Sequence, residues 1–441
     1  MIDLSSSFPT ARRKPLLSVV SMVLAMLVVP PVQSSEVDLL IEKLVAKGIL
    51  NEGDAKEIRA EVARERQQAA AAPVEIQDLG TLPVAHAPAE AKEHWSDKIS
   101  FKGDLRVRYQ GEELDNAPSI GPFDIDERNR WRIRWRAGVE ADVSDRWEVG
   151  FGLASGGSDA RSSNQTLRNA FSTGDARLDY AFARFKAGDG VDVVAGKFKN
   201  PIWKPKDLLW DSDIRTDGVA VPMEFGVNDR VSAFVTPAYL VLTEDVIGGQ
   251  DDAAMWLLQA GANFDLSDAV SLTVAPTYYN FVNLKGSKGP ITVDVPSNAR
   301  GEDDRFVYDY DSIALGGKLD IDGTELIPRV SVFGEWVKAF DPDEEDTGWL
   351  VGLALGDAKV SNFGDWQLKY NYRRLEADAW PEFLSDSDFF FGATNVKGSE
   401  FEFIWGLAKG VNVSVDYYTA AKFIGSDLEQ DLLQLDLNVK W

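Results

Sequence analysis

Regularly spaced charged residues are the feature of this sequence that could act on a passing solute. Arginine occupies every second position from residue 128 to residue 136, and three of the positions between hold Trp131, Ile133 and Trp135. Successive side chains of a β-strand point to opposite faces, so this spacing predicts a strand with one basic and one apolar face. A row of fixed positive charge beside a water-filled passage favours anions or anionic groups. The predicted basic wall consists of Arg106, Arg108, Arg130, Arg132, Arg134 and Arg136.

Acidic residues on other predicted strands offer an alternative, because carboxylates facing the basic wall would neutralise it. The candidates for this neutralisation are Asp104, Glu140, Glu148, Asp179, Glu400 and Glu402. The sequence leaves both outcomes open.

A second charged segment spans residues 196–215, where lysines come first and aspartates follow. Pro201, Trp203 and Leu209 make it unusually apolar for a solvated loop. We therefore expect it to fold into a lumen and set opposite charges across a narrow passage, where low-dielectric walls strengthen their field. The alternative is an outward loop with weak surface ion pairs. Its candidate constriction residues are Lys197, Lys199, Lys204, Lys206, Asp207, Asp211, Asp213 and Arg215.

Enzymatic chemistry has little support in the sequence. The two histidines, His86 and His94, precede the first predicted strand, so no strand-borne Ser-His site can form. Cysteine is absent, which removes thiolate chemistry. The acidic run 341–346 lacks the glycine of an EF-hand loop and is better interpreted as a solvated loop than as a divalent-cation site. We expect no catalytic residues, no cofactor and no metal site, and a net charge of -25 argues against nucleic-acid binding.

The last nine residues, 433–441, alternate strictly between apolar and polar side chains and end on Trp441. This pattern is typical of the closing strand of an outer-membrane barrel, with one face toward lipid and the other toward a hydrated lumen. Because only helices and closed barrels satisfy the backbone within hydrocarbon, a barrel is the expected membrane fold.

Sixteen segments with period-two alternation follow one another, and each nears or exceeds the length of about 9–11 residues that a tilted strand needs to cross a membrane. They lie near residues 99–109, 131–143, 146–155, 176–187, 191–199, 217–225, 229–242, 253–266, 269–283, 306–321, 326–340, 347–358, 363–378, 396–408, 411–423 and 430–441. Short connections alternate with longer ones, as in barrels with short periplasmic turns and long outer loops. The longest connections are 111–128, 155–175, 200–216, 284–305 and 379–395.

The amino-terminal part predicts three further units. Residues 1–34 carry basic residues, an apolar run and small residues typical of a secretory signal peptide. Residues 35–68 show helical spacing around Gly48 and predict a periplasmic helical hairpin, which either self-associates or acts as a spacer. Residues 69–96 form an Ala/Pro-rich linker, and residues 97–441 form the barrel.

Several segments together resemble the putative porin family of Gram-negative bacteria. These are residues 40–50, 196–203 and 208–213, together with the aromatic terminus, where Trp441 replaces the more usual phenylalanine. The resemblance implies that residues 200–216, after the fifth strand, fold inward as a constriction. It also implies a trimer and a passive diffusion channel.

The sequence therefore predicts an all-β, 16-stranded antiparallel transmembrane barrel with a periplasmic helical hairpin. The predicted function is that of an outer-membrane porin for ions and small hydrophilic solutes. A substrate-specific uptake channel and a non-conducting structural or adhesive barrel are the alternatives. Expected partners are outer-membrane lipid, lipopolysaccharide and two further copies of the chain.

Overall fold

The computed structural model describes residues 95–115, 127–168, 170–244, 251–290 and 296–441. The predicted signal peptide, the helical hairpin and almost all of the linker lie outside these residues. A short 3-10 helix, η1 (Trp95–Lys98), leads into the first strand.

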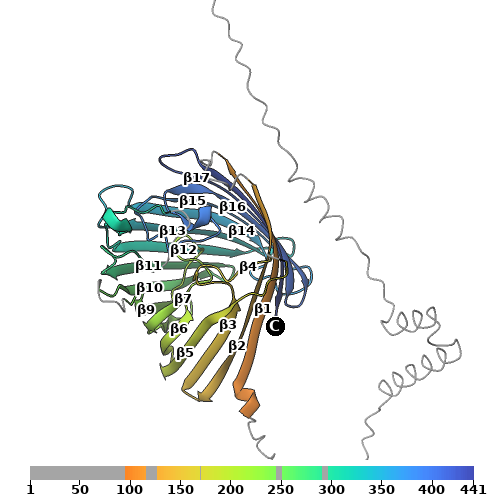
Figure 1. The fold of residues 1–441 in the computed structure, drawn as a ribbon. Coiled ribbons are helices and arrows are strands. Elements are labelled where there is room, and N and C mark those ends of the chain that lie inside the picture. The colour runs from red at the N-terminus through yellow and green to blue at the C-terminus, as the bar shows by residue number, and fades with distance from the viewer. Residues whose placement is uncertain (1–94, 116–126, 169, 245–250, 291–295) are drawn as a thin grey trace, which may run out of the picture. The chain divides into compact units, whose positions relative to one another are not determined.

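The described residues form a single antiparallel sheet that closes on itself (Figure 1). Its strands are β1 (Ile99–Asp115), β2 (Glu127–Ser144), β3 (Trp147–Ser155), β4 (Gln165–Thr166), β5 (Ala176–Gly188), β6 (Val191–Lys199), β7 (Arg215–Ala220), β8 (Met223–Asn228), β9 (Val231–Val241), β10 (Ala254–Ser267), β11 (Val270–Val282), β12 (Ser312–Asp322), β13 (Arg329–Ala339), β14 (Thr347–Gly356), β15 (Trp366–Leu375), β16 (Val396–Ala408), β17 (Val411–Lys422) and β18 (Glu429–Lys440). Two further 3-10 turns, η2 (Glu302–Asp304) and η3 (Phe390–Gly392), lie in loops. The pairing of β1 with β18, from Asp104 opposite Lys440 to Asp115 opposite Glu429, closes the barrel and confirms the predicted closing strand.

These segments make sixteen wall strands, as the alternation predicted. β7 and β8 occupy one wall position between β6 and β9, and they are separated at Val221 and Pro222. Proline has no amide hydrogen to donate to a neighbouring strand, so the ladder is interrupted there. β4 is a two-residue segment that pairs with β2 beyond the end of β3.

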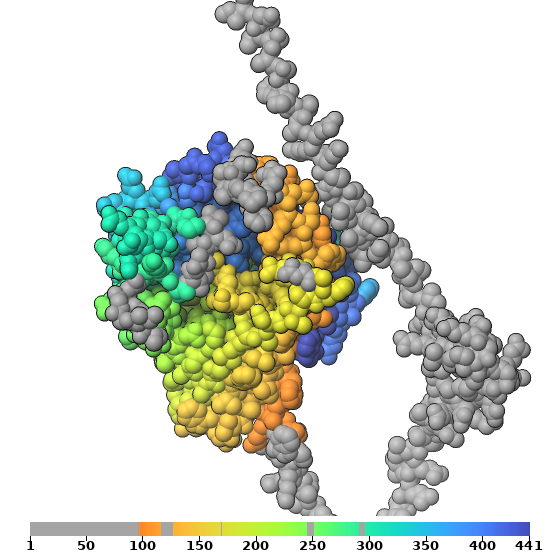
Figure 2. All heavy atoms as spheres, viewed as in Figure 1, coloured from red at the N-terminus to blue at the C-terminus, as the bar shows by residue number. Residues whose placement is uncertain are grey.

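The outer face of the wall is apolar. On β14, Trp349, Val351 and Leu353 are 37%, 49% and 39% exposed, whereas Leu350, on the opposite face, is 2% exposed. Trp131 and Trp256 are each 56% exposed on the same outer surface. The space-filling view shows the atoms of successive segments packed side by side over the barrel (Figure 2). An apolar band around a barrel is suited to hydrocarbon, and the predicted outward aromatic residues fit it.

The connections alternate in length, as predicted. The short turns include 145–146, 189–190, 229–230, 268–269 and 409–410, all at the end where β1 begins and β18 ends. In outer-membrane barrels this end faces the periplasm. None of the helices within the described residues is long and apolar enough to cross a membrane.

One predicted strand begins later than expected. The segment 306–321 was predicted as a single strand, but β12 begins at Ser312. Phe306 and Tyr310 are 2% and 0% exposed. They belong to a buried apolar cluster that also contains residues of the connections 200–214 and 376–395. Burial in this cluster takes residues 306–311 out of the wall.

Candidate constriction in the lumen

The loop between β6 and β7, residues 200–214, folds into the barrel, as the sequence predicted, and we call it the first inward loop. Its apolar side is buried, with Leu209 at 0% and Trp210 at 1% exposure. The ring of Trp210 lies 6.4 Å from that of Tyr279 on β11 and 6.0 Å from that of Trp380. A loop that buries large aromatic surface against the wall keeps a defined position in the lumen.

Polar contacts fix the same loop to β10, and close packing places it against β12. Gln259 accepts a hydrogen bond from the backbone N–H of Trp203 at 2.7 Å and donates one to its carbonyl at 2.8 Å. On β12, a Cβ added at Gly316 would come within 3.1 Å of Trp203 and 3.2 Å of Pro205. The absent side chain lets the loop backbone approach the wall closely.

A second loop, residues 376–395 between β15 and β16, also enters the lumen, and we call it the second inward loop. The indole N–H of Trp380 donates to the carbonyl of Leu209 at 2.6 Å, and the N–H of Asp211 donates to the carbonyl of Leu384 at 2.7 Å. Both bonds join it to the first inward loop. The sequence analysis treated 379–395 only as a long outer loop, although its content of Trp380, Leu384 and four phenylalanines was the same apolar signal that marked residues 200–214.

A third, smaller segment, residues 156–164, completes the junction. The backbone N–H and the hydroxyl of Ser163 both donate to the Oδ2 atom of Asp213, at 3.1 Å and 2.7 Å. Arg161 is 4% exposed and donates to the carbonyl of Glu382 at 3.1 Å. Three loops therefore meet inside the barrel.

A cavity of about 920 Å³ lies beneath this junction, on the side of the short turns. We call it the periplasmic vestibule. Residues 358–362, 409–410 and Trp441 line its periplasmic rim, and residues 206–207, 211–213 and 386–388 line its roof. The predicted basic wall contributes Arg106, Arg108 and Arg134 to its lining.

The periplasmic half of the basic wall is neutralised. Arg134 and Arg136 both contact Asp104, at 3.0 Å and 2.7 Å, and both contact Asp213 of the first inward loop, at 3.5 Å and 3.3 Å. On the neighbouring strand, Arg108, which lies opposite Arg132 in the register, is also paired and holds Asp436 of β18 through two bonds of 2.7 Å and 2.8 Å. Asp104 was among the predicted neutralising residues, whereas Asp213 was predicted only as a residue of the constriction.

The other candidate acids pair elsewhere. Glu140 pairs with Lys102, Glu148 with Arg184 at 3.0 Å, and Asp179 with Arg215 at 3.5 Å. Glu400 and Glu402 contact Lys206, at 2.7 Å and 3.8 Å.

The outer half of the basic wall, Arg130 and Arg132, is compensated more weakly. The closest carboxylate to Arg130 is that of Glu112, at 3.5 Å. Arg132 donates to the neutral amide oxygen of Gln110 at 3.1 Å and forms no ion pair within the described part of the chain. The fixed positive charge is thus concentrated on the outer side of the junction, where neutral and weak partners leave it available to a solute.

The remaining predicted residues fall into two groups. Lys206, Asp207, Asp211 and Asp213 lie together at the roof of the vestibule. Lys204 turns back and donates to the carbonyl of Trp210.

Lys197 and Lys199 do not join the constriction, contrary to the prediction. Both lie on the face of β6 opposite Phe198, which is 3% exposed in the luminal cluster. Lys197 pairs with Asp217 at 2.9 Å. The strict alternation of β6 is the physical reason, since it places the neighbours of an inward side chain on the outer face.

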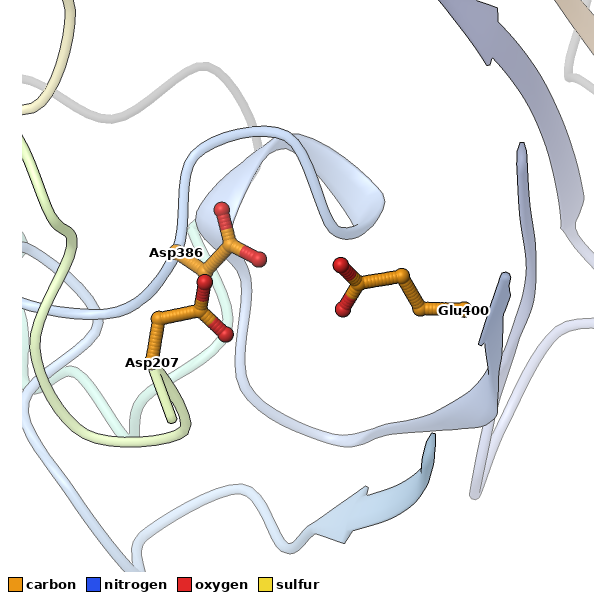
Figure 3. A group of neighbouring side chains, drawn as sticks. All are labelled: Asp207, Asp386 and Glu400. Carbon is orange, nitrogen blue, oxygen red and sulfur yellow. The ribbon is translucent and has the colours of Figure 1, made fainter. Parts of the chain in front are cut away.

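Three carboxylates gather where both inward loops meet the wall, with one oxygen of each within 4.8 Å of the others. Asp207 and Asp386 lie side by side, and Glu400 extends toward them from its strand (Figure 3). Arg373 of β15 contacts all three, at 3.0 Å, 3.0 Å and 2.5 Å respectively. The sequence analysis missed Arg373, because it stands outside the arginine row and its partners are distant in sequence.

Two aspartates at the roof titrate differently. Burial would raise the pKa of Asp213, but Arg134, Arg136 and Arg106 outweigh it and hold that pKa below its usual range. Burial, followed by repulsion from Asp213, raises the pKa of Asp211 to about 7. Asp213 is therefore charged near neutral pH, whereas Asp211 is partly protonated.

We expect the ion preference of the channel to depend on pH through Asp211. As the pH rises from 6 to 8, Asp211 loses its proton and adds negative charge to the vestibule roof, so the reversal potential in a salt gradient should move toward cations. Because the pKa of Asp211 is raised in the folded protein, the protonated group stabilises the folded state at low pH. This contribution to the free energy of unfolding is lost as the pH rises through about 7. Planar-bilayer recordings of the wild type and of Asp211→Asn measure the effect. The Asp211→Asn variant should show a smaller shift, while Asp213→Asn, which removes the repulsion, should move the response to lower pH. Equal shifts in wild type and Asp211→Asn would contradict the assignment.

Comparison with known proteins agrees with this architecture. A family model described as "Putative porin" matches residues 123–312 and 320–441. A high-pH structure of Pseudomonas putida OprB superposes with a TM-score of 0.51 at 12% identity and covers 78% of this chain and 95% of that chain. A mutant of the Rh. blastica porin gives a TM-score of 0.42 at 12% identity, covering 78% and 100%. No curated protein matches the chain.

The likeness to OprB supports the barrel fold alone, because the identity is low. The family model goes further, since it covers well over half of the sequence, including the first inward loop and every strand from β2 to β18 apart from the residues between 312 and 320. The closed barrel, the apolar exterior and the hydrated vestibule are those of a channel in the outer membrane. The chain therefore belongs to the family described as putative porins, and it is an outer-membrane porin channel.

Proposed function

We propose that this porin conducts ions and small hydrophilic solutes passively and prefers anions or anionic groups. The observation that carries the proposal is the weakly compensated positive charge on the outer side of the loop junction, where Arg130 meets Glu112 at 3.5 Å and Arg132 donates to the neutral amide of Gln110. The periplasmic half of the same arginine row is paired with Asp104 and Asp213 and contributes little net charge. A solute entering from outside would therefore meet the basic half first.

The position of these two arginines in the passage explains why they affect its ion preference more than the many surface acids of the chain do. Charges that face a narrow passage are screened less than charges in open solvent, where the Debye length is about 8 Å at physiological ionic strength. Field lines concentrate between low-dielectric walls, which raises the local concentration of counter-ions. The net charge of the whole chain, -25, thus does not set the preference of the passage.

Neutralising both arginines tests this proposal. The double variant Arg130→Gln/Arg132→Gln should shift the zero-current potential in a potassium chloride gradient toward cations, and the shift should shrink at 1 M salt, where the Debye length is about 3 Å. Arg374→Gln is the matched control, because Arg374 neighbours Arg373 on β15 but pairs with Glu376 and lies over the ring of Phe423. An unchanged potential in the double variant would remove the row from the selectivity mechanism.

A substrate-specific uptake channel is the second candidate function, and the densely charged roof of the vestibule favours it. Roof residues Lys206, Asp207 and Asp213 could bind one class of polar solute during passage. Saturable block of the ion current by a single solute would support this function, whereas equal, unsaturated passage of many solutes would support general diffusion.

The family resemblance supports three further proposals about assembly. We propose that the barrel forms a homotrimer, that its outer loops contact lipopolysaccharide and that residues 35–68 form the periplasmic helical hairpin. Crosslinking in outer-membrane vesicles, with and without residues 35–68, would test whether the trimer forms and whether the hairpin contributes to it.

A further inference from the structure

Arg373 stands at a place where both inward loops meet the barrel wall. Its side chain is 3% exposed. It reaches Asp207 of the first inward loop, Asp386 of the second and Glu400 of β16. Its guanidinium also lies over the ring of Phe389, 4.5 Å from the centroid. One cation therefore contacts two loops and two strands of the wall.

The geometry suits a guanidinium and no smaller cation. The Nη1 atom donates a hydrogen bond to Asp386 at 3.0 Å, while Nη2 donates to both Asp207 at 3.0 Å and Glu400 at 2.5 Å. The Nε atom donates to Asn371 at 3.3 Å. A planar fork holds several acceptors at fixed angles, whereas a lysine ammonium is a single point charge on a flexible stem.

Without Arg373 the three carboxylates would repel one another. Their oxygens lie within 4.8 Å. Lys206 contacts Asp207 at 3.5 Å and Glu400 at 2.7 Å, and Lys204 acts on Asp207 and Asp386 through space. Two ammonium groups cannot fully balance three buried carboxylates, so the acids would separate, bind a cation from solution or take up protons.

We propose that Arg373 is the positioning residue of this porin, the internal counter-ion that holds both inward loops at the wall and so fixes the passage between them and the basic wall. The proposal rests on the lumen being the conducting path, but it does not depend on the anion preference proposed above. In the wild type the guanidinium occupies the centre of the carboxylate group, so this group is not a metal site there.

Three variants separate the positioning role from a general effect on charge. Arg373→Met should shift the reversal potential toward cations, because it leaves uncompensated carboxylates at the vestibule, and should increase the noise of the open-channel current, because the loops lose their shared anchor. Arg373→Lys keeps the charge, so its reversal potential should stay near that of the wild type while its current noise increases. Arg374→Met, one residue away, should resemble the wild type in both readouts.

Divalent cations provide a readout that loss of packing alone would not change. Calcium at millimolar concentration should reduce the current noise of Arg373→Met at least about twofold by bridging the freed carboxylates, and it should leave the wild type and Arg373→Lys unchanged. Heat-modifiable migration in gels identifies folded barrels before recording. If Arg373→Met does not fold, Asp386→Asn provides the second test. It removes the ion pair between Arg373 and the second inward loop, so the current noise should rise.

The proposal is overturned if folded Arg373→Met matches the wild type in noise, potential and calcium response, or if Asp386→Asn is as quiet as the wild type. Failure of the anion preference would appear separately, as an unchanged potential in the Arg130→Gln/Arg132→Gln variant. The two proposals are thus tested by different variants.

Discussion

Replacing Trp210 with alanine should produce one of the two largest changes in this channel, a higher and less uniform single-channel conductance together with a less stable barrel. Trp210 is 1% exposed, and its indole N–H donates to the hydroxyl of Tyr279 at 3.3 Å. Removing a buried tryptophan costs about 3–5 kcal/mol, since the cavity it leaves does not collapse fully. The first inward loop would lose its main apolar contact and move away from the wall.

Single-channel recording and the midpoint of heat-modifiable unfolding measure the two effects. Trp256→Ala is the matched control, because Trp256 is 56% exposed on the outer face of β10 and cannot touch the inward loops. It should leave conductance unchanged. A Trp210→Ala channel with wild-type conductance would show that the polar bonds of Gln259 hold the loop by themselves.

The second large effect should come from Arg108→Met at the seam where the barrel closes. Arg108 and Asp436 are each 3% exposed in their side chains, and their two parallel bonds join β1 to β18. Arg108 also reaches Asp388 of the second inward loop at 3.1 Å. Removing one partner of a buried pair leaves an uncompensated charge, which costs about 3–5 kcal/mol.

The double variant Arg108→Met/Asp436→Leu should recover part of this loss, because it removes one of the two carboxylates that Arg108 contacts and leaves only Asp388 without it. Arg184→Met is the control, since Arg184 is 36% exposed and its pairing with Glu148 is worth about 0–1 kcal/mol. With Asp436→Leu added, the unfolding midpoints of the wild type, the two single variants and the double variant give the coupling between the two residues. If the double variant were no more stable than Arg108→Met, the seam would not depend on this ion pair.

The sequence contained enough information for the barrel. Strand alternation depends on neighbouring residues alone, so the sixteen wall strands, their inward and outward faces and the side of the short turns could be predicted without coordinates. The apolar character of residues 200–214 likewise revealed a loop that avoids solvent, and the structure places it in the lumen. Residues 376–395 carry the same apolar signal, which also predicts an inward loop. The alternation around Phe198 likewise predicts that Lys197 and Lys199 lie on the outer face of the barrel.

The pairing of charges inside the lumen was decided by the tertiary structure. Arg108 and Asp436 are 328 positions apart, and Arg373 is 166 positions from Asp207. A Coulomb interaction depends on distance through space, and no local pattern determines which acid a given arginine meets when the barrel closes and the loops fold inward. The sequence thus established a wall with a row of arginines, whereas only the closed, loop-filled barrel decided that the periplasmic half of that row is neutralised, that the outer half is left basic and that Arg373 joins the loops to the wall.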